Sequence, residues 1–134
     1  MYLTNKILLA FFLVFTLTSV STTSIAAGKI ENATLEEIKA SIDTTIERSE
    51  KTLTALESGS DQETILNLLS DTKRMAKEIH ATRRAAVFKS KAGTQMKKAR
   101  KAAKKDDMET AKEHVAKGVE FYKQLKQAFL ESNE

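Results

Sequence analysis

The chain has 134 residues, with 22 Lys or Arg, 18 Asp or Glu and a formal net charge of +4. It contains no cysteine and no proline. The lack of cysteine excludes a disulfide-stapled fold, a thiolate metal site and a cysteine nucleophile. The lack of proline excludes a proline-rich linker protein. The length corresponds to one domain.

Residues 1–26 have the pattern of a secretory signal peptide. Lys6 precedes a 14-residue apolar stretch, Ile7–Val20, and small or polar residues follow it. Ser24 and Ala26 fit the small-x-small rule, which predicts cleavage after Ala26. A lipid-modified N-terminus is excluded, because no cysteine follows the apolar stretch. We therefore expect a protein that is exported to the periplasm or secreted.

Two alternatives to this cleavage stay open. Cleavage after Ala27 fits the small-residue rule nearly as well. An uncleaved membrane anchor is the other alternative, because the uncharged run from Ile7 to Gly28 is 22 residues long and could span a bilayer. Ser and Thr crowd the second half of this run and weaken its insertion, so a cleaved signal peptide is preferred.

Residues 27–134 are predicted to form a single domain of amphipathic helices. Apolar residues recur every three or four positions, and no strand-like alternation is present. Thr34 and Glu37 have the spacing of a capping box, and so do Ser60 and Glu63. Gly59 supplies a left-handed stop between them. The expected helices span about 34–58, 60–80, 83–105 and 107–131.

Two boundaries fit the stretch between the second and third helices, which contains neither Gly nor Pro from Ile79 to Arg84. In the first, the second helix breaks near His80 and Thr82 caps the third helix. In the second, the second helix continues to Lys89 and breaks at Gly93. The sequence leaves both open.

The third helix, on the first of these boundaries, carries a narrow stripe of mostly small residues. Such a stripe lets a neighbouring helix approach closely. The turn that follows has lysines before it and aspartates after it, as the helix dipole favours at each end. Four helices with short connections predict an all-α fold, an antiparallel up-down-up-down four-helix bundle. The stripe consists of Ala85, Phe88, Ala92, Met96, Ala99 and Ala103.

Charge is segregated along the chain. Residues 28–72 hold ten acidic and four basic residues, and residues 106–134 hold seven acidic and four basic ones. Residues 73–105, in contrast, hold thirteen basic residues and one acidic residue. Two interpretations are open. The basic helix could form ion pairs with its acidic neighbours across the bundle, where each exposed pair contributes little to stability. Alternatively, it forms an anion-binding surface.

The anion-binding interpretation predicts a contact face on the third helix. Its partner would be a polyanion, an acidic lipid headgroup layer of the cell envelope or an acidic protein. Nucleic acid is not expected, because export removes the protein from it and the basic segment has a single aromatic residue for base stacking, Phe88. A homodimer through the first helix is a further partner prediction. The candidate residues are Arg83, Arg84, Lys89, Lys91, Lys97, Lys98, Arg100, Lys101, Lys104 and Lys105.

The two histidines are the candidate metal ligands. In the expected bundle, His80 and His114 lie near opposite ends, roughly 15–20 Å apart. Neither has a Glu three residues before it, so the Glu-x-x-His pairs of di-iron bundles are absent. A Gly-rich phosphate loop and a nucleophile elbow are absent as well. The sequence therefore predicts a protein that is not an enzyme and needs no cofactor.

The signal peptide, the length, the four helices and the Ala/Lys-rich final hairpin resemble the soluble b-type cytochromes of the periplasm. That resemblance implies a four-helix bundle in which haem is held by a Met on the first helix and a His on the last. Here the first predicted helix contains no Met, and His114 is the candidate on the last helix. Met75, Met96 and Met108 all lie elsewhere.

A second resemblance covers about a third of the chain. The segment Arg100–Ala111, leading into Lys117–Tyr122, looks like the hairpins of small exported helical proteins, including the small metal-binding protein type, and of tetratricopeptide units. The metal-binding type is His-rich, whereas this chain has two His. A repeat with the 34-residue period of a tetratricopeptide array is not visible.

The function predicted from the sequence is that of a non-catalytic exported helical-bundle protein, which binds a partner through a basic face on its third helix. One alternative is a periplasmic metal or haem carrier that uses His114 or His80. Another is a periplasmic chaperone-like holdase, which would use exposed basic and apolar surface.

Overall fold

Residues 33–134 are described by the computed structural model, and they form four α-helices with no strand among them. The helices are α2 (Leu35–Glu57), α3 (Gln62–Lys77), α4 (Arg83–Lys104) and α5 (Met108–Glu131). The prediction of an all-helical protein with four helices is confirmed for these residues. The predicted signal peptide, residues 1–26, lies outside the described residues. None of the described helices is long and apolar enough to cross a membrane.

Side-chain caps fix where α2 and α3 begin. Thr34 and Glu37 form the predicted capping box: the Thr34 N–H donates to Glu37 Oε2 at 2.7 Å, and the Glu37 N–H donates to Thr34 Oγ1 at 3.2 Å. At α3 the expected cap, Ser60, is wrong by one residue. Asp61 is the cap and accepts the Thr64 N–H at 3.1 Å. Its negative charge also suits a helix N-terminus, and the hydrogen bonds from Thr64 lower the pKa of the carboxyl group.

The first of the two predicted boundaries between α3 and α4 is confirmed. The helix α3 ends at Lys77, and Thr82 caps α4 by accepting the Ala85 N–H at 3.4 Å. The alternative break at Gly93 is wrong, because α4 runs through this residue without interruption. The Thr82 oxygen accepts a backbone N–H that would otherwise lack a partner, and this marks the beginning of a helix. A single glycine inside a helix lowers its stability but does not end it.

Two helices end in the same left-handed turn. Gly59 after α2 has φ 74°, and Asp106 after α4 has φ 60°. In each case the following N–H donates back across the turn, from Ser60 to the Ala55 carbonyl and from Asp107 to the Ala102 carbonyl, both at 3.0 Å. This is the Schellman arrangement, which normally places Gly at the left-handed position. Asp106 therefore takes a backbone conformation that disfavours any residue with a side chain.

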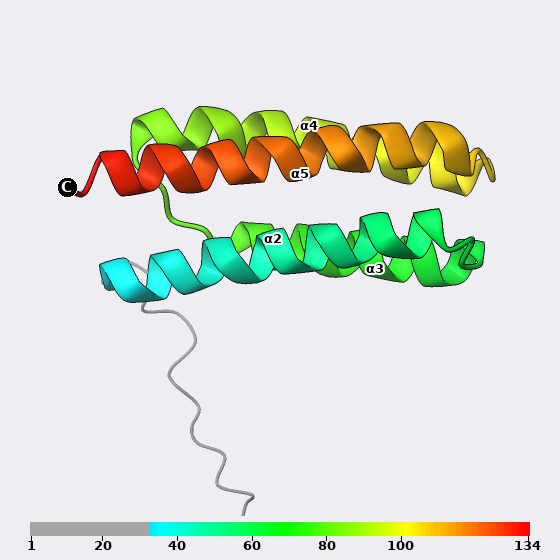
Figure 1. The fold of residues 1–134 in the computed structure, drawn as a ribbon, viewed down its shortest axis with the longest axis horizontal. Helices are drawn as coiled ribbons and strands as arrows, with labels where there is room; N and C mark the ends of the chain where they lie inside the picture. Colours follow the sequence, from blue (N-terminus) through cyan, green and yellow to red (C-terminus); the bar gives the residue numbers. More distant parts are fainter. Residues whose placement is uncertain (1–32) are drawn as a thin grey trace, which may run out of the picture. The chain divides into compact units, whose positions relative to one another are not determined.

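The four helices lie side by side, with α4 and α5 as the upper pair and α2 and α3 as the lower pair in Figure 1. Each helix contacts two others: α2 packs on α3 and α5, and α4 packs on α3 and α5. Arg84, near the beginning of α4, contacts Glu131, at the end of α5. Likewise, Asp43 in the first half of α2 contacts Lys126 in the last turns of α5.

The alanine stripe of α4 allows its close packing on α5, which is the most extensive helix contact in the protein. Gly118 on α5 contributes, since a Cβ there would lie 2.5 Å from the Met96 methyl carbon on α4. Of the predicted stripe, Phe88 is only half-buried, because its ring lies at the edge of the core. The alanines with no exposed surface on α4 are Ala85, Ala92, Ala99 and Ala103.

Hydroxyl side chains fill part of the core between α2 and α3. Thr45, Ser49, Thr52 and Thr72 are fully buried. Each hydroxyl donates to a carbonyl of its own helix one turn earlier, at 2.8–2.9 Å. The Thr52 and Thr72 hydroxyls also lie 3.4 Å apart across the two helices. Because their polar atoms are satisfied locally, these residues can occupy core positions that the apolar pattern does not mark.

We expect Asp106→Gly to stabilise the protein. Glycine removes the strain of the left-handed backbone, while adding entropy to the unfolded chain. The free energy of unfolding, measured by urea denaturation, should rise by about 0.5–1 kcal/mol. Asp106→Asn separates the charge effect from the backbone effect. The matched change Gly59→Ala should lower stability by about 1 kcal/mol, and a loss of stability in Asp106→Gly would contradict the geometry.

Candidate anion-binding site

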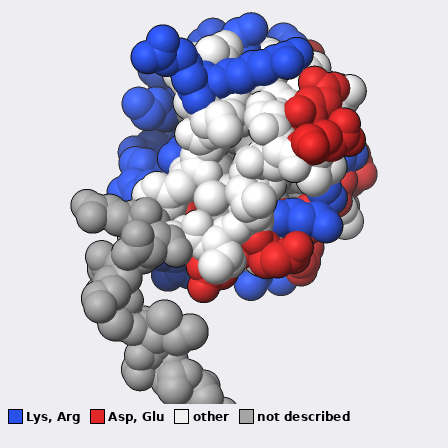
Figure 2. Space-filling model, turned by 90° about the vertical axis from the view of Figure 1, so that its left-hand side faces the viewer, with Lys and Arg blue, Asp and Glu red and all other residues white. Residues whose placement is uncertain are grey.

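The predicted candidate residues are distributed around the outer side of α4, which contains no acidic residue. Lys89 and Arg100 are half-buried, and the other eight are exposed. We call these eight the basic face of α4. Seen from one end of the bundle, Lys and Arg gather on the upper left and Asp and Glu on the right and below (Figure 2). The basic face consists of Arg83, Arg84, Lys91, Lys97, Lys98, Lys101, Lys104 and Lys105.

Pairing of this face with the acidic helices is limited. Among the described residues, Arg84 is its one member in an ion pair, 3.4 Å from Glu131. The other ion pairs lie within α3 or join α5 to itself and to α2. Lys91 instead lies over two aromatic rings, with its Nζ 5.7 Å from the ring centres of Phe88 and Phe121. Most of the positive charge of α4 therefore faces solvent without a negative partner.

A cavity of about 290 Å³ lies where α3 faces α4. The contact between these two helices is the least extensive in the bundle. The inner wall is apolar and includes Leu69, Met96 and Tyr122, the last reaching in from α5. All three are at least nine-tenths buried. We call this cavity the α3–α4 pocket.

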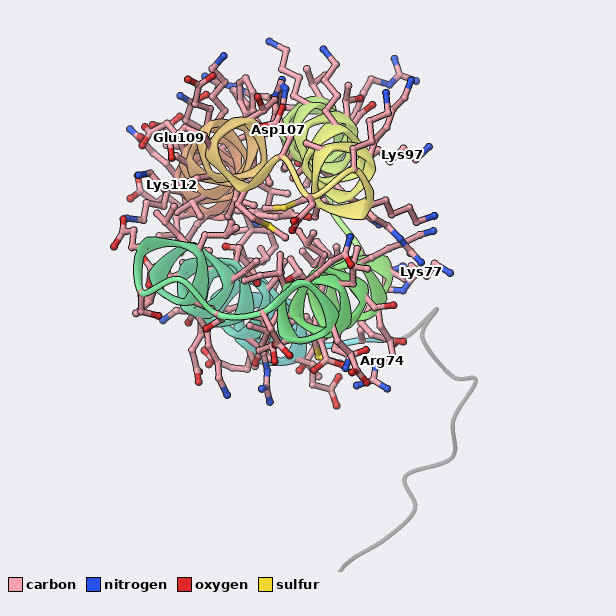
Figure 3. All side chains as sticks on the ribbon, turned by 90° about the vertical axis from the view of Figure 1, so that its right-hand side faces the viewer. Arg74, Lys77, Lys97, Asp107, Glu109 and Lys112 are labelled. Carbon is pink, nitrogen blue, oxygen red and sulfur yellow. The ribbon has the colours of Figure 1, made fainter. Side chains whose placement is uncertain are left out.

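Basic side chains line the rest of the α3–α4 pocket. Five contribute, two from α3 and three from α4, and no acidic residue does. Lys77 and Lys97 point away from the bundle on the same side (Figure 3). Glu109 and Lys112, at the start of α5, lie on the other side of the same view. The five basic residues are Lys73, Lys77, Lys89, Lys97 and Arg100.

The two ends of the seam between α3 and α4 are held by side-chain hydrogen bonds. At one end, Gln62 Nε2 donates to the Ala103 carbonyl at 2.9 Å and to the Lys104 carbonyl at 3.2 Å. At the other end, Lys89 Nζ donates to the Ile79 carbonyl at 2.8 Å, and burial lowers the pKa of this amine. These hydrogen bonds hold α3 and α4 together on both sides of the pocket, and few side chains fill the space between them.

Arg100 lines the pocket and carries one buried donor. Its Nε atom is shielded from solvent and has no hydrogen-bond partner among the described residues. A buried N–H of a charged group without a partner costs free energy. The terminal nitrogens of the Arg100 guanidinium and the neighbouring lysines are positively charged donors, and they make the site suited to an oxyanion.

Gly93 lines the pocket from the middle of α4. A glycine inside a helix costs about 1 kcal/mol relative to alanine. Close packing does not explain it, since a Cβ at this position would meet no atom within 4 Å. The absence of a side chain at Gly93 leaves the wall of the α3–α4 pocket open.

The two histidines lie apart from this site and from each other. His80 is exposed in the connection between α3 and α4. His114 is half-buried on α5, and its Nδ1 lies 2.8 Å from Gln95 Oε1 on α4. In the part of the chain that the structure describes, no cluster of three His, Cys, Asp or Glu side chains is placed to hold a metal ion.

Comparisons of the chain with models of protein families, with curated proteins and with solved structures find no match. The site therefore has to be interpreted from its own geometry. Of the residues that line the pocket, the sequence marked only Lys89, Lys97 and Arg100 as candidates; among those that it missed are Lys73 and Lys77 on α3 and Tyr122 on α5. The two lysines lie one helical turn apart inside the basic segment 73–105, and this spacing is the signal that could have found them.

We expect the buried phenol of Tyr122 to make stability fall at alkaline pH. Burial raises its pKa from 10.0 to about 12. Below pH 10 its stabilising effect is complete, and it is lost as the pH rises towards 12, because the unfolded chain ionises first. Between pH 9 and pH 11 the free energy of unfolding should fall by about 1 kcal/mol more in the native protein than in Tyr122→Phe. Equal losses in both proteins, measured by urea denaturation, would contradict the burial of this group.

Proposed function

We propose that this protein is a non-catalytic exported binding protein, which contacts an anionic partner through the basic face of α4. Export depends on the signal peptide predicted at residues 1–26. The bundle itself is proposed to have the up-down-up-down order, which the contact of Arg84 with Glu131 and that of Asp43 with Lys126 both support. The proposal includes no catalytic step and no resident cofactor.

The observation that carries this proposal is the unpaired charge on α4. Lys97, Lys101 and Lys104 follow one another at spacings of four and three residues, so they lie along one face of the helix. These lysines have no ion pair among the described residues, although acidic residues are abundant on the other helices. Like charges held together raise the local positive potential, and an anionic surface that replaces their counterions is attracted to it.

The partner that best matches this face is a layer of acidic lipid headgroups of the cell envelope. A bound lysine near such a surface contributes about 1 kcal/mol, and a helix presents several at once without a shape-matched pocket. Large apolar side chains that would insert among lipid tails are rare on the described surface, where Leu35, Val87 and Leu130 are the exposed ones. Binding should therefore be largely electrostatic.

We expect purified protein to bind vesicles of phosphatidylglycerol mixed with phosphatidylcholine, and not vesicles of phosphatidylcholine alone. Replacing Lys98, Lys101 and Lys105 by Glu should weaken binding roughly a hundredfold, at about 1 kcal/mol for each lysine removed. Added NaCl should weaken the binding of the native protein steeply, because the headgroup charges are screened within about 10 Å. Co-sedimentation at low and at high salt measures both effects.

A matched control separates the position of the charge from its total. Replacing Lys39, Lys51 and Lys117, on α2 and α5, by Glu changes the net charge by the same amount and should reduce vesicle binding far less. Equal losses in the two triple variants would show that net charge, and not the basic face of α4, controls binding. Binding that does not respond to salt would also overturn the proposal.

A further inference from the structure

We infer that the α3–α4 pocket binds a single-chain amphiphilic anion, an alkyl carboxylate whose tail occupies the cavity and whose headgroup meets Arg100 and the surrounding lysines. This inference deepens the proposed function, on which it rests for the anionic character of the partner. It differs in requiring an internal site, whereas the basic face of α4 needs only an exposed surface.

The inner wall of the pocket is suited to a hydrocarbon tail. Its volume of about 290 Å³ is roughly twice that of a cavity of ~150 Å³ that holds one benzene molecule. It therefore has room for roughly a dozen carbon atoms. Leu69, Met96 and Tyr122 give it an apolar surface, and the methionine side chain can adapt to an irregular tail. Each methylene group transferred from water contributes to affinity.

The basic residues at the pocket select the charge of the headgroup. Arg100 lines the pocket, and the two terminal nitrogens of its guanidinium can bind a carboxylate with two parallel hydrogen bonds. Lys73 and Lys77 on α3 and Lys97 on α4 line the same pocket. With no acidic residue in the lining, an ammonium headgroup would meet only repulsion. The ligand is therefore an anion with an apolar tail.

The helix packing explains why this cavity lies between α3 and α4. The close contact of α4 with α5 fixes α4 from one side, and α3 is the shortest of the four helices, with 16 residues. Gln62 and Lys89 hold the two ends of the seam by hydrogen bonds to backbone carbonyls. Gly93 removes the side chain that would otherwise enter the cavity between them. The same four features position an apolar space beneath a positively charged rim.

Binding of dodecanoate, below its micelle-forming concentration, tests this inference by isothermal titration calorimetry. We expect one dodecanoate bound per chain, and no binding of dodecyltrimethylammonium, which has the same tail and the opposite charge. Arg100→Met should weaken dodecanoate binding at least roughly tenfold, because a charge-assisted hydrogen bond is lost. Arg100→Lys, which keeps the charge, should recover part of the affinity. Equal binding of the two amphiphiles, or no dodecanoate binding, would overturn the inference.

Gly93 provides a test that leaves every charge in place. Gly93→Leu should fill the cavity and abolish dodecanoate binding, while Gly93→Ala should fold at least as well as the native protein and still bind. Circular dichroism checks that both variants are helical, and Gly93→Met serves as a second filling variant. If a folded filling variant still binds dodecanoate as tightly as the native protein, the ligand is elsewhere and the inference is wrong.

The two proposals fail separately. The triple variant of Lys98, Lys101 and Lys105 alters residues outside the pocket, so it should lose vesicle binding and keep dodecanoate binding. Gly93→Leu should do the opposite. Loss of dodecanoate binding in the triple variant would mean that the outer basic face, and not the pocket, attracts the anion.

Discussion

The close packing of α4 on α5 is the constraint on which the rest of the structure depends. Ala85, Ala92, Ala99 and Ala103 have no exposed surface, and Gly118 leaves space for the Met96 methyl group. Each small residue buries little apolar area. The interface is therefore stabilised by many van der Waals contacts along the whole length of the two helices, and not by a few large side chains. Any larger residue in the alanine stripe would separate the helices and disturb both sides of α4.

This packing determines where the charges of α4 lie. With its small residues turned inward, every Lys and Arg of the helix is left at its outer side or at the seam with α3. The outer residues have few acidic partners, because α4 does not pack on α2. Two acidic residues of α2, Glu50 and Asp43, pair with Lys123 and Lys126 of α5, and the positive charge of α4 remains available for an external anion.

The sequence predicted the number of helices, their approximate ends and the alanine stripe, because these depend on local periodicity and capping. It did not reveal the buried hydroxyls of Thr45 and Thr52, since a threonine that bonds to its own helix is indistinguishable from a surface threonine in a hydropathy pattern. The candidate basic residues of α4 were identified, but the α3–α4 pocket was not. A cavity depends on how far apart two helices settle, which a one-dimensional pattern does not contain. The left-handed turn at Asp106 was not predicted either, because glycine is the residue that normally marks this position.

The most direct test of the uncompensated charge on α4 is the effect of NaCl on stability, measured by urea denaturation without any ligand. If the lysines of α4 mainly repel one another, screening should relieve the repulsion, so the free energy of unfolding should rise with NaCl. The rise should be smaller when Lys98, Lys101 and Lys105 are replaced by Glu. A free energy of unfolding that falls with NaCl would mean that α4 is held by ion pairs to its acidic neighbours, and it would contradict this account of the basic face.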